Sequence, residues 1–177
     1  SSGLVVTEEQ MKQFIALRDK VKYPRTRDFM DYFLFSLNAC GLRFSDLLTL
    51  EWRNIDFAKK SLRKILYKGD KPHEIPLNDN AIRILEQWHD RTGENRFVFG
   101  LLDDDFDLHD KEERKRMRLN KNRAIITSLR TLGEKMGLPF NLTIHVARHT
   151  FAVWALNKGV DVHVISRLMA HCSVMVT

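Results

Sequence analysis

Two histidines and an arginine lie close together in TIHVARHTFAVWALNKG, residues 143–159, a segment that otherwise has the apolar spacing of a buried helix. His145, Arg148 and His149 stand at relative positions i, i+3 and i+4, so on a helix their side chains share one stripe. Such a stripe can bind an anion and move protons, or it can be a polar seam whose groups satisfy one another. The segment alone leaves both interpretations open.

Other cationic side chains lie next to segments that are expected to be apolar and buried. Arg43 follows a buried helical segment, Lys68 lies at an expected hairpin turn, and His171 follows the last helical segment. Each has an ordinary structural explanation by itself, since Arg43 can pair with Asp46 and a turn lysine keeps a hairpin soluble.

As a set, these residues would form a strongly cationic pocket that folding alone does not favour. Arginine offers paired donors to phosphoryl oxygens, lysine offers a compact charge or a proton, and histidine exchanges a proton near neutral pH. A phosphodiester ligand explains the whole set. We therefore predict that one cleft holds Arg43, Lys68, His145, Arg148 and His171.

The composition is that of a soluble globular chain with excess positive charge. Its 177 residues suit one domain, and no apolar run approaches the ~20 residues that cross a bilayer. The net charge of +6 weakly favours a polyanionic partner. Cys40 and Cys172 lack metal-ligand spacing, so we expect free thiols, and the absence of a signal-peptide pattern predicts a cytoplasmic location.

Helical spacing dominates the first part of the chain. Thr7 and Gln10 form a capping box that starts one helix, and an almost continuously apolar helix over 26–39 should cross the core. Gly41 should stop that helix in a left-handed cap, and Ser45 can cap a short helix after it.

The middle of the chain changes its pattern. LRKILYKGDKPHEIPL, residues 62–77, alternates around a KGDK turn and predicts a β-hairpin. A helix over 81–91 follows, with Asn78 or Asp79 as its cap and Gly93 at its end. The fold class is therefore mainly α with a small antiparallel β-sheet.

The segment 100–120 is rich in charge and has no clear period, so we expect an exposed loop there. A solvated charged face is the favoured interpretation, and contact of Lys115, Arg116 or Arg118 with a DNA backbone is the alternative. Further helices are predicted over 122–136, over 143–159, and from the cap residue Asp161 onward.

Four segments resemble sequence boxes of the tyrosine recombinases, also called phage-type integrases. GLRFSDLLTLEWRNID resembles their first arginine box, YKGDKPHEIPL their lysine hairpin, IHVARHTFA their H-x-x-R-H box, and LMAHCSVMVT their L-G-H-S segment. The boxes follow the family's order and spacing over residues 41–177. The resemblance implies the catalytic-domain fold of that family, and site-specific cutting and rejoining of DNA, as in the integrases of mobile elements.

The resemblance also implies a role for each site residue. It maps the two phosphate-binding arginines onto Arg43 and Arg148 and the acid that protonates the departing 5′-oxygen onto Lys68. His145 and His171 complete the pocket, with His145 assisting proton transfer at the nucleophile.

Supporting roles fall to Asp46, which would orient Arg43, and to His149, which would buttress Arg148. No metal and no nucleotide cofactor is implied, because the family conserves bond energy in a 3′-phosphotyrosine. The implied partner is double-stranded DNA, bound by a homotetramer of the full-length protein, while this chain alone would be a monomer.

The chain departs from the family pattern in two places. Ala170 and Cys172 replace the usual Gly and Ser around the third histidine. The family's nucleophilic tyrosine would fall three positions beyond Thr177, and the tyrosines that are present lie in other segments: Tyr23, Tyr32 and Tyr67. We therefore expect 1–177 to be a catalytic domain truncated before its nucleophile, without the family's amino-terminal DNA-binding domain, and inactive by itself.

Three alternatives remain at this stage. The chain can be a DNA-binding module that does not cleave, or a strand transferase resembling type IB topoisomerases. A metal-dependent hydrolase using His145, His149 and His171 is disfavoured, because cationic neighbours repel a divalent ion and no carboxylate cluster is present. Within the family, an integrase and a chromosome-resolving recombinase are both compatible with the sequence.

Overall fold

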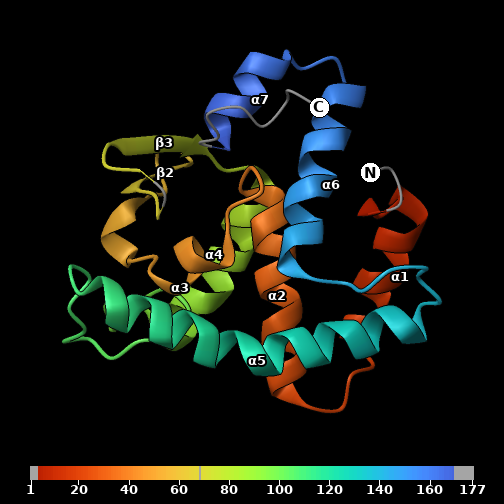
Figure 1. The fold of residues 1–177 in the computed structure, drawn as a ribbon, viewed down its shortest axis with the longest axis horizontal. Coiled ribbons are helices and arrows are strands. Elements are labelled where there is room, and N and C mark those ends of the chain that lie inside the picture. The colour runs from red at the N-terminus through yellow and green to blue at the C-terminus, as the bar shows by residue number, and fades with distance from the viewer. Residues whose placement is uncertain (1–3, 68, 170–177) are drawn as a thin grey trace.

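The computed structural model describes residues 4–67 and 69–169 and confirms a mainly helical fold with a small antiparallel sheet (Figure 1). The helices are α1 Glu8–Arg18, α2 Pro24–Asn38, α3 Phe44–Leu48, α4 Asp79–Thr92, α5 Lys111–Lys135, α6 Ile144–Asn157 and α7 Val162–Leu168. The strands are β1 Ile55–Asp56, β2 Ser61–Ile65 and β3 Pro72–Pro76, and a 3₁₀ turn, η2 Trp52–Asn54, precedes β1. Within the described part of the chain, no helix has the length and apolar character needed to cross a membrane.

Helix α2 forms the centre of the molecule, as its apolar run predicts. It packs against α4, α5 and α6, and its Met30, Phe33 and Phe35 side chains are fully buried. The Tyr32 and Phe35 rings lie 5.0 and 5.5 Å from the Phe99 ring and meet it edge-on, a favoured arrangement for aromatic pairs. This packing gives the later elements a rigid base.

A tight turn ends α2 and brings the chain against α6. Gly41 has a φ of +71°, as predicted, and its N–H donates to the Ser36 carbonyl over 2.8 Å. A Cβ at Gly41 would lie only 3.1 Å from the Cα of Arg148. Glycine is therefore needed both for the backbone conformation and for the close approach of α6.

The caps of the helices are mostly those predicted. Thr7 and Gln10 form the capping box of α1, and Asn78 caps α4. The prediction for α3 is wrong, since the helix begins at Phe44 with Arg43 in the cap position and no side-chain cap. Ser45 is buried inside α3, because tertiary packing outweighs the modest preference of serine for a helix start.

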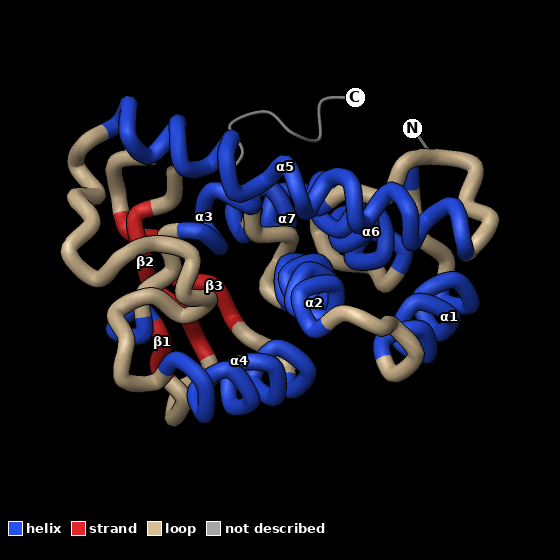
Figure 2. Tube along the Cα trace, turned by 90° about the horizontal axis from the view of Figure 1, so that it is seen from below, coloured by secondary structure: helices blue, strands red, loops and turns tan. Residues whose placement is uncertain are grey.

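The predicted hairpin forms from β2 and β3, with Leu62 paired to Ile75 and both side chains buried. A third strand, β1, adds to the outer side of β2. Its two residues are too few to show an alternating pattern in the sequence. The sheet lies at one end of the molecule and α1 at the other (Figure 2).

The expectation of a loop over 100–120 is wrong in its second half. Helix α5 begins at Lys111, and the Asp110 side chain caps it by accepting from the Glu113 N–H over 3.1 Å. The helix runs for 25 residues and includes the predicted segment 122–136. Its first turns are largely exposed, so they carry no apolar period, although their acidic residues suit a helix start.

Candidate active site

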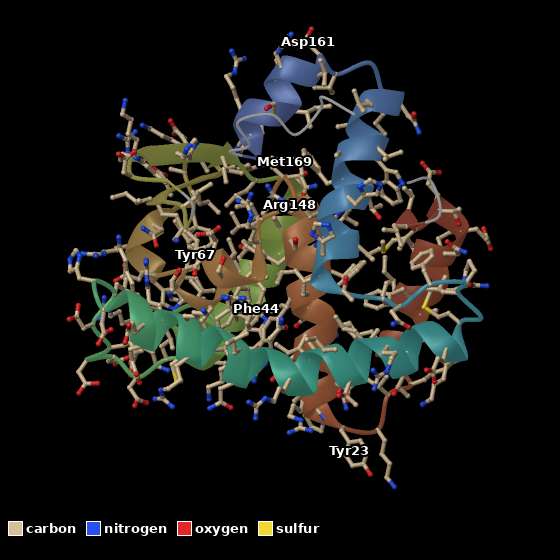
Figure 3. The ribbon with its side chains drawn as sticks, viewed as in Figure 1. Tyr23, Phe44, Tyr67, Arg148, Asp161 and Met169 are labelled. Atoms are coloured by element: carbon tan, nitrogen blue, oxygen red, sulfur yellow. The ribbon has the colours of Figure 1, made fainter. Side chains whose placement is uncertain are left out.

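A cavity of about 490 Å³ opens between α3, α5 and the start of α6. Arg43, His145 and Arg148 line it, so three of the five residues predicted to converge do so. Lys68 and His171 lie outside the described residues. Figure 3 shows Arg148 on α6, with Phe44 and Tyr67 on the side of the cavity toward α5.

Arg148 is the most deeply buried cation of the cavity, with 4% of its surface exposed. One guanidinium nitrogen donates to the Gly41 carbonyl over 2.6 Å and another to the Met169 carbonyl over 2.7 Å. Burial, followed by the charge of Arg43, lowers the pKa of Arg148 to about 9, while Asp46 opposes the shift. Both hydrogen-bond acceptors are neutral, so they orient the guanidinium without cancelling its charge.

Arg43 brings a second positive charge to the same cavity. It is half-buried at the start of α3, directly after the turn at Gly41. Burial lowers the pKa of Arg43, and the nearby Asp46 charge partly offsets this effect. Arg43 disfavours the charged form of Arg148, and an anion bound between the two guanidinium groups would stabilise both charges.

His145 lies at the partly exposed rim of the cavity, in the first turn of α6. Partial burial lowers the pKa of His145 below its ordinary value, and the charges of Arg148, His149 and Arg43 lower it further. The shift favours the neutral imidazole, which can accept a proton. His149 is half-buried one turn later, and its role as a buttress stays a prediction.

Asp46 forms its ion pair with a residue that the sequence did not suggest. Its Oδ1 lies 3.3 Å from the Lys64 Nζ and accepts from the Tyr67 N–H over 2.7 Å. The pairing with Arg43 that we expected from their nearness in sequence is therefore replaced by one with Lys64, because the hairpin folds over α3. Asp46 acts on Arg43 through its charge, and it ties α3 to the hairpin just before Lys68.

Comparison with known proteins agrees with this geometry. The model of the phage integrase family matches residues 5–177. The chain belongs to the phage integrase family. Among curated relatives, tyrosine recombinase XerA of Pyrococcus horikoshii is 27% identical over 175 residues, covering 97% of this chain and 54% of the relative. Tyrosine recombinase XerD of Proteus mirabilis is 34% identical over 146 residues, covering 80% of this chain and 43% of the relative.

Solved structures of recombinases share the fold. The XerA recombinase crystal structure superposes with a TM-score of 0.69 at 23% identity, covering 97% of this chain and 57% of that one. The Tn1549 transposon integrase, solved with a circular intermediate DNA, superposes with a TM-score of 0.72 at 16% identity. The match covers 97% of this chain and 59% of the integrase chain. The predicted tyrosine recombinase fold is confirmed, and the chain spans about half the length of the relatives it matches.

The cavity of this phage integrase family member also contains residues that the sequence analysis did not place there. Tyr67 and Arg118 line it, and none of the described residues around it is acidic. The sequence excludes Tyr67 as a nucleophile, and it predicts a loop at Arg118, with contact to a DNA backbone as the alternative. Once α5 is known to be a helix, the i, i+4 spacing of Arg114 and Arg118 becomes a signal that they share one face.

Proposed function

We propose that this chain supplies the phosphate-activating site of a site-specific DNA recombinase or integrase. The observation that carries the proposal is the convergence of Arg43, His145 and Arg148 on one cavity whose described lining has no acid. Negative charge grows on a phosphoryl group that is under attack, and preorganised cations stabilise that charge most effectively away from bulk water. Membership of the phage integrase family and the recombinase names of the relatives support the same conclusion.

The reaction is a transesterification. A tyrosine oxygen attacks the scissile phosphorus while Arg43 and Arg148 bind the non-bridging oxygens. The neutral His145 accepts the proton of the nucleophile. The bond to the 5′-oxygen then breaks as Lys68 protonates that oxygen, and His171 donates to the phosphoryl group. Religation reverses these steps, and neither a metal nor a nucleotide is required.

The protein that performs this chemistry is a longer recombinase of which this chain is the catalytic domain. Its tyrosine follows Thr177 by three positions, and an amino-terminal domain completes a clamp around double-stranded DNA. The active species is a homotetramer on DNA in the cytoplasm of a prokaryotic cell. In support, the Tn1549 integrase and the XerH recombinase, which share the fold, were solved with DNA, XerH with its difH substrate.

Covalent capture of DNA tests this function. The protein extended through the tyrosine and carrying its amino-terminal domain is incubated with a labelled suicide substrate and a chelator, then resolved on a denaturing gel. We expect an adduct from the extended protein and none from the 177-residue chain. Arg148→Ala should slow adduct formation about a hundredfold or more, because it removes a charged donor from the transition state.

Two results would count against the proposal. An adduct that required magnesium would indicate a metal-dependent nuclease. DNA binding without any adduct in the extended protein would indicate a DNA-binding module that does not cleave.

A further inference from the structure

Two arginines of α5 converge on a single aromatic ring beside the cavity. Arg114 and Arg118 lie one helical turn apart, and their guanidinium carbons are 5.3 and 5.8 Å from the centroid of the Tyr67 ring. Tyr67 lies two residues after Ile65, the last residue of β2, and Figure 3 shows it between the hairpin and α5.

Among residues 4–67 and 69–169, no carboxylate forms an ion pair with either arginine. In the part of the chain that the structure describes, the Nε atoms of Arg114 and Arg118 are buried and have no hydrogen-bond partner. Like charges at i and i+4 destabilise a helix. By contrast, Arg116 lies on another face of α5 and pairs with Glu113. Glu113 therefore neutralises the charge of Arg116, whereas the Tyr67 ring attracts the charges of Arg114 and Arg118 without neutralising them.

The backbone of Tyr67 is held in place next to the cavity, so its ring can serve as a platform. The Tyr67 N–H donates to the buried Asp46 carboxylate over 2.7 Å. A ring face attracts a guanidinium but cannot accept several N–H donors, so most of the hydrogen-bonding capacity of both arginines remains for another ligand. Arginine is suited to binding phosphate through paired donors.

This cluster adjoins the cavity, because Tyr67 and Arg118 line the same space as Arg43 and Arg148. We propose that Arg114 and Arg118, stacked on Tyr67, bind a second phosphate of the DNA backbone, next to the phosphate held in the cavity. The inference rests on the proposed function, since it takes duplex DNA as the ligand. The second phosphate fixes the course of the strand past the hairpin that carries Lys68.

The salt dependence of DNA binding tests this subsite. The 177-residue chain is titrated with a short duplex of arbitrary sequence at several salt concentrations. The logarithm of the binding constant falls by about 0.9 per decade of salt for each phosphate neutralised. We expect the Arg114→Gln/Arg118→Gln double variant to reduce the slope by about that amount and to weaken binding about tenfold at low salt.

Matched variants separate the subsite from general loss of charge and from misfolding. Arg116→Gln removes one positive charge from the same helix and should leave the slope nearly unchanged, because Glu113 already pairs with Arg116. Tyr67→Leu should weaken binding and reduce the slope as the double variant does, because the platform for both guanidinium groups is lost. The thermal unfolding of each variant is followed alongside.

The outcomes distinguish the two proposals. If the double variant and Arg116→Gln have the same slope while Arg148→Gln weakens binding, the second subsite is wrong and the proposed function stands. If the unaltered chain binds duplex DNA without salt dependence, the subsite and the proposed function both fail.

Discussion

Two equally buried charged residues, Asp31 on α2 and Arg148 on α6, are stabilised in opposite ways. Asp31 and Arg148 each expose 4% of their surface. Asp31 accepts from two nitrogens of Arg18, at 2.8 and 3.1 Å, and from the Trp88 indole at 3.1 Å. Arg148 has two backbone carbonyls and the repulsion of Arg43. The first cluster is complete in itself, whereas in the second no described carboxylate forms an ion pair with Arg148, on which Asp46 acts only through its charge.

The pKa shifts of the two arginines show the same difference. The hydrogen bond to Asp31 raises the pKa of Arg18 above its ordinary value. Burial lowers the pKa of Arg148 to about 9. A buried charge that the fold neutralises contributes to structure, whereas one that the fold orients but leaves unneutralised is prepared for a ligand.

The largest expected effect on stability comes from breaking the complete cluster. Asp31→Ala leaves Arg18 and the Trp88 N–H without their acceptor and should lower the free energy of unfolding by about 3 kcal/mol. Arg148→Met removes an unneutralised charge but leaves two carbonyls without a donor, so its net cost should be only about 1 kcal/mol. Urea denaturation measures both, and an Arg148→Met variant less stable than Asp31→Ala would contradict the comparison.

Anion binding should depend more on Arg148 than on Asp31, which is the reverse of their order for stability. Sulfate resembles a phosphodiester in its tetrahedral oxygens and should stabilise the unaltered chain by about 2.7 kcal/mol at a hundred times its dissociation constant. Arg148→Met should abolish this stabilisation, while a folded Asp31→Asn variant should keep it. Thermal unfolding with increasing sulfate, at constant ionic strength set by chloride, gives the measurement.

The pH dependence of stability and of sulfate affinity should show that His145 lies at the anion site. The pKa of His145 is lowered in the folded chain, so without an anion the unfolded state binds more protons below about pH 6.5 and stability is lost as the pH falls. Bound sulfate favours the protonated imidazole, so sulfate affinity should rise over the same acidic range. His145→Gln should weaken the pH dependence of both the free energy of unfolding and the sulfate affinity. If the sulfate affinity of this variant still rose as the pH fell, another group would be the one that titrates at the site.

The smallest effect is expected at the exposed edge of the complete cluster. Arg91 pairs with Asp28 over 2.8 Å and stacks on Trp88, but 53% of the Arg91 side chain is exposed. Solvent screens this pair, so Asp28→Asn should lower the free energy of unfolding by only about 0.5 kcal/mol. A loss as large as that of Asp31→Ala would show that burial is not what separates the two positions.

Local signals determined most of the secondary structure. The capping box at Thr7 and Gln10, the left-handed turn at Gly41 and the alternation of the hairpin each act over a few neighbouring residues, so the sequence shows them directly. The grouping of Arg43, His145 and Arg148 was also foreseen, from their chemistry and from family resemblance. Neither clue required knowledge of the packing.

Tertiary structure alone decided the partners of the charged groups. Asp46 is three residues from Arg43 but pairs with Lys64, because hairpin and α3 meet only in the folded chain. The first half of α5 has no apolar face to reveal it, and the convergence of Arg114 and Arg118 on Tyr67 depends on where α5 crosses the hairpin. Caps and periods are properties of adjacent residues, whereas the balance of buried charge depends on segments far apart in the chain.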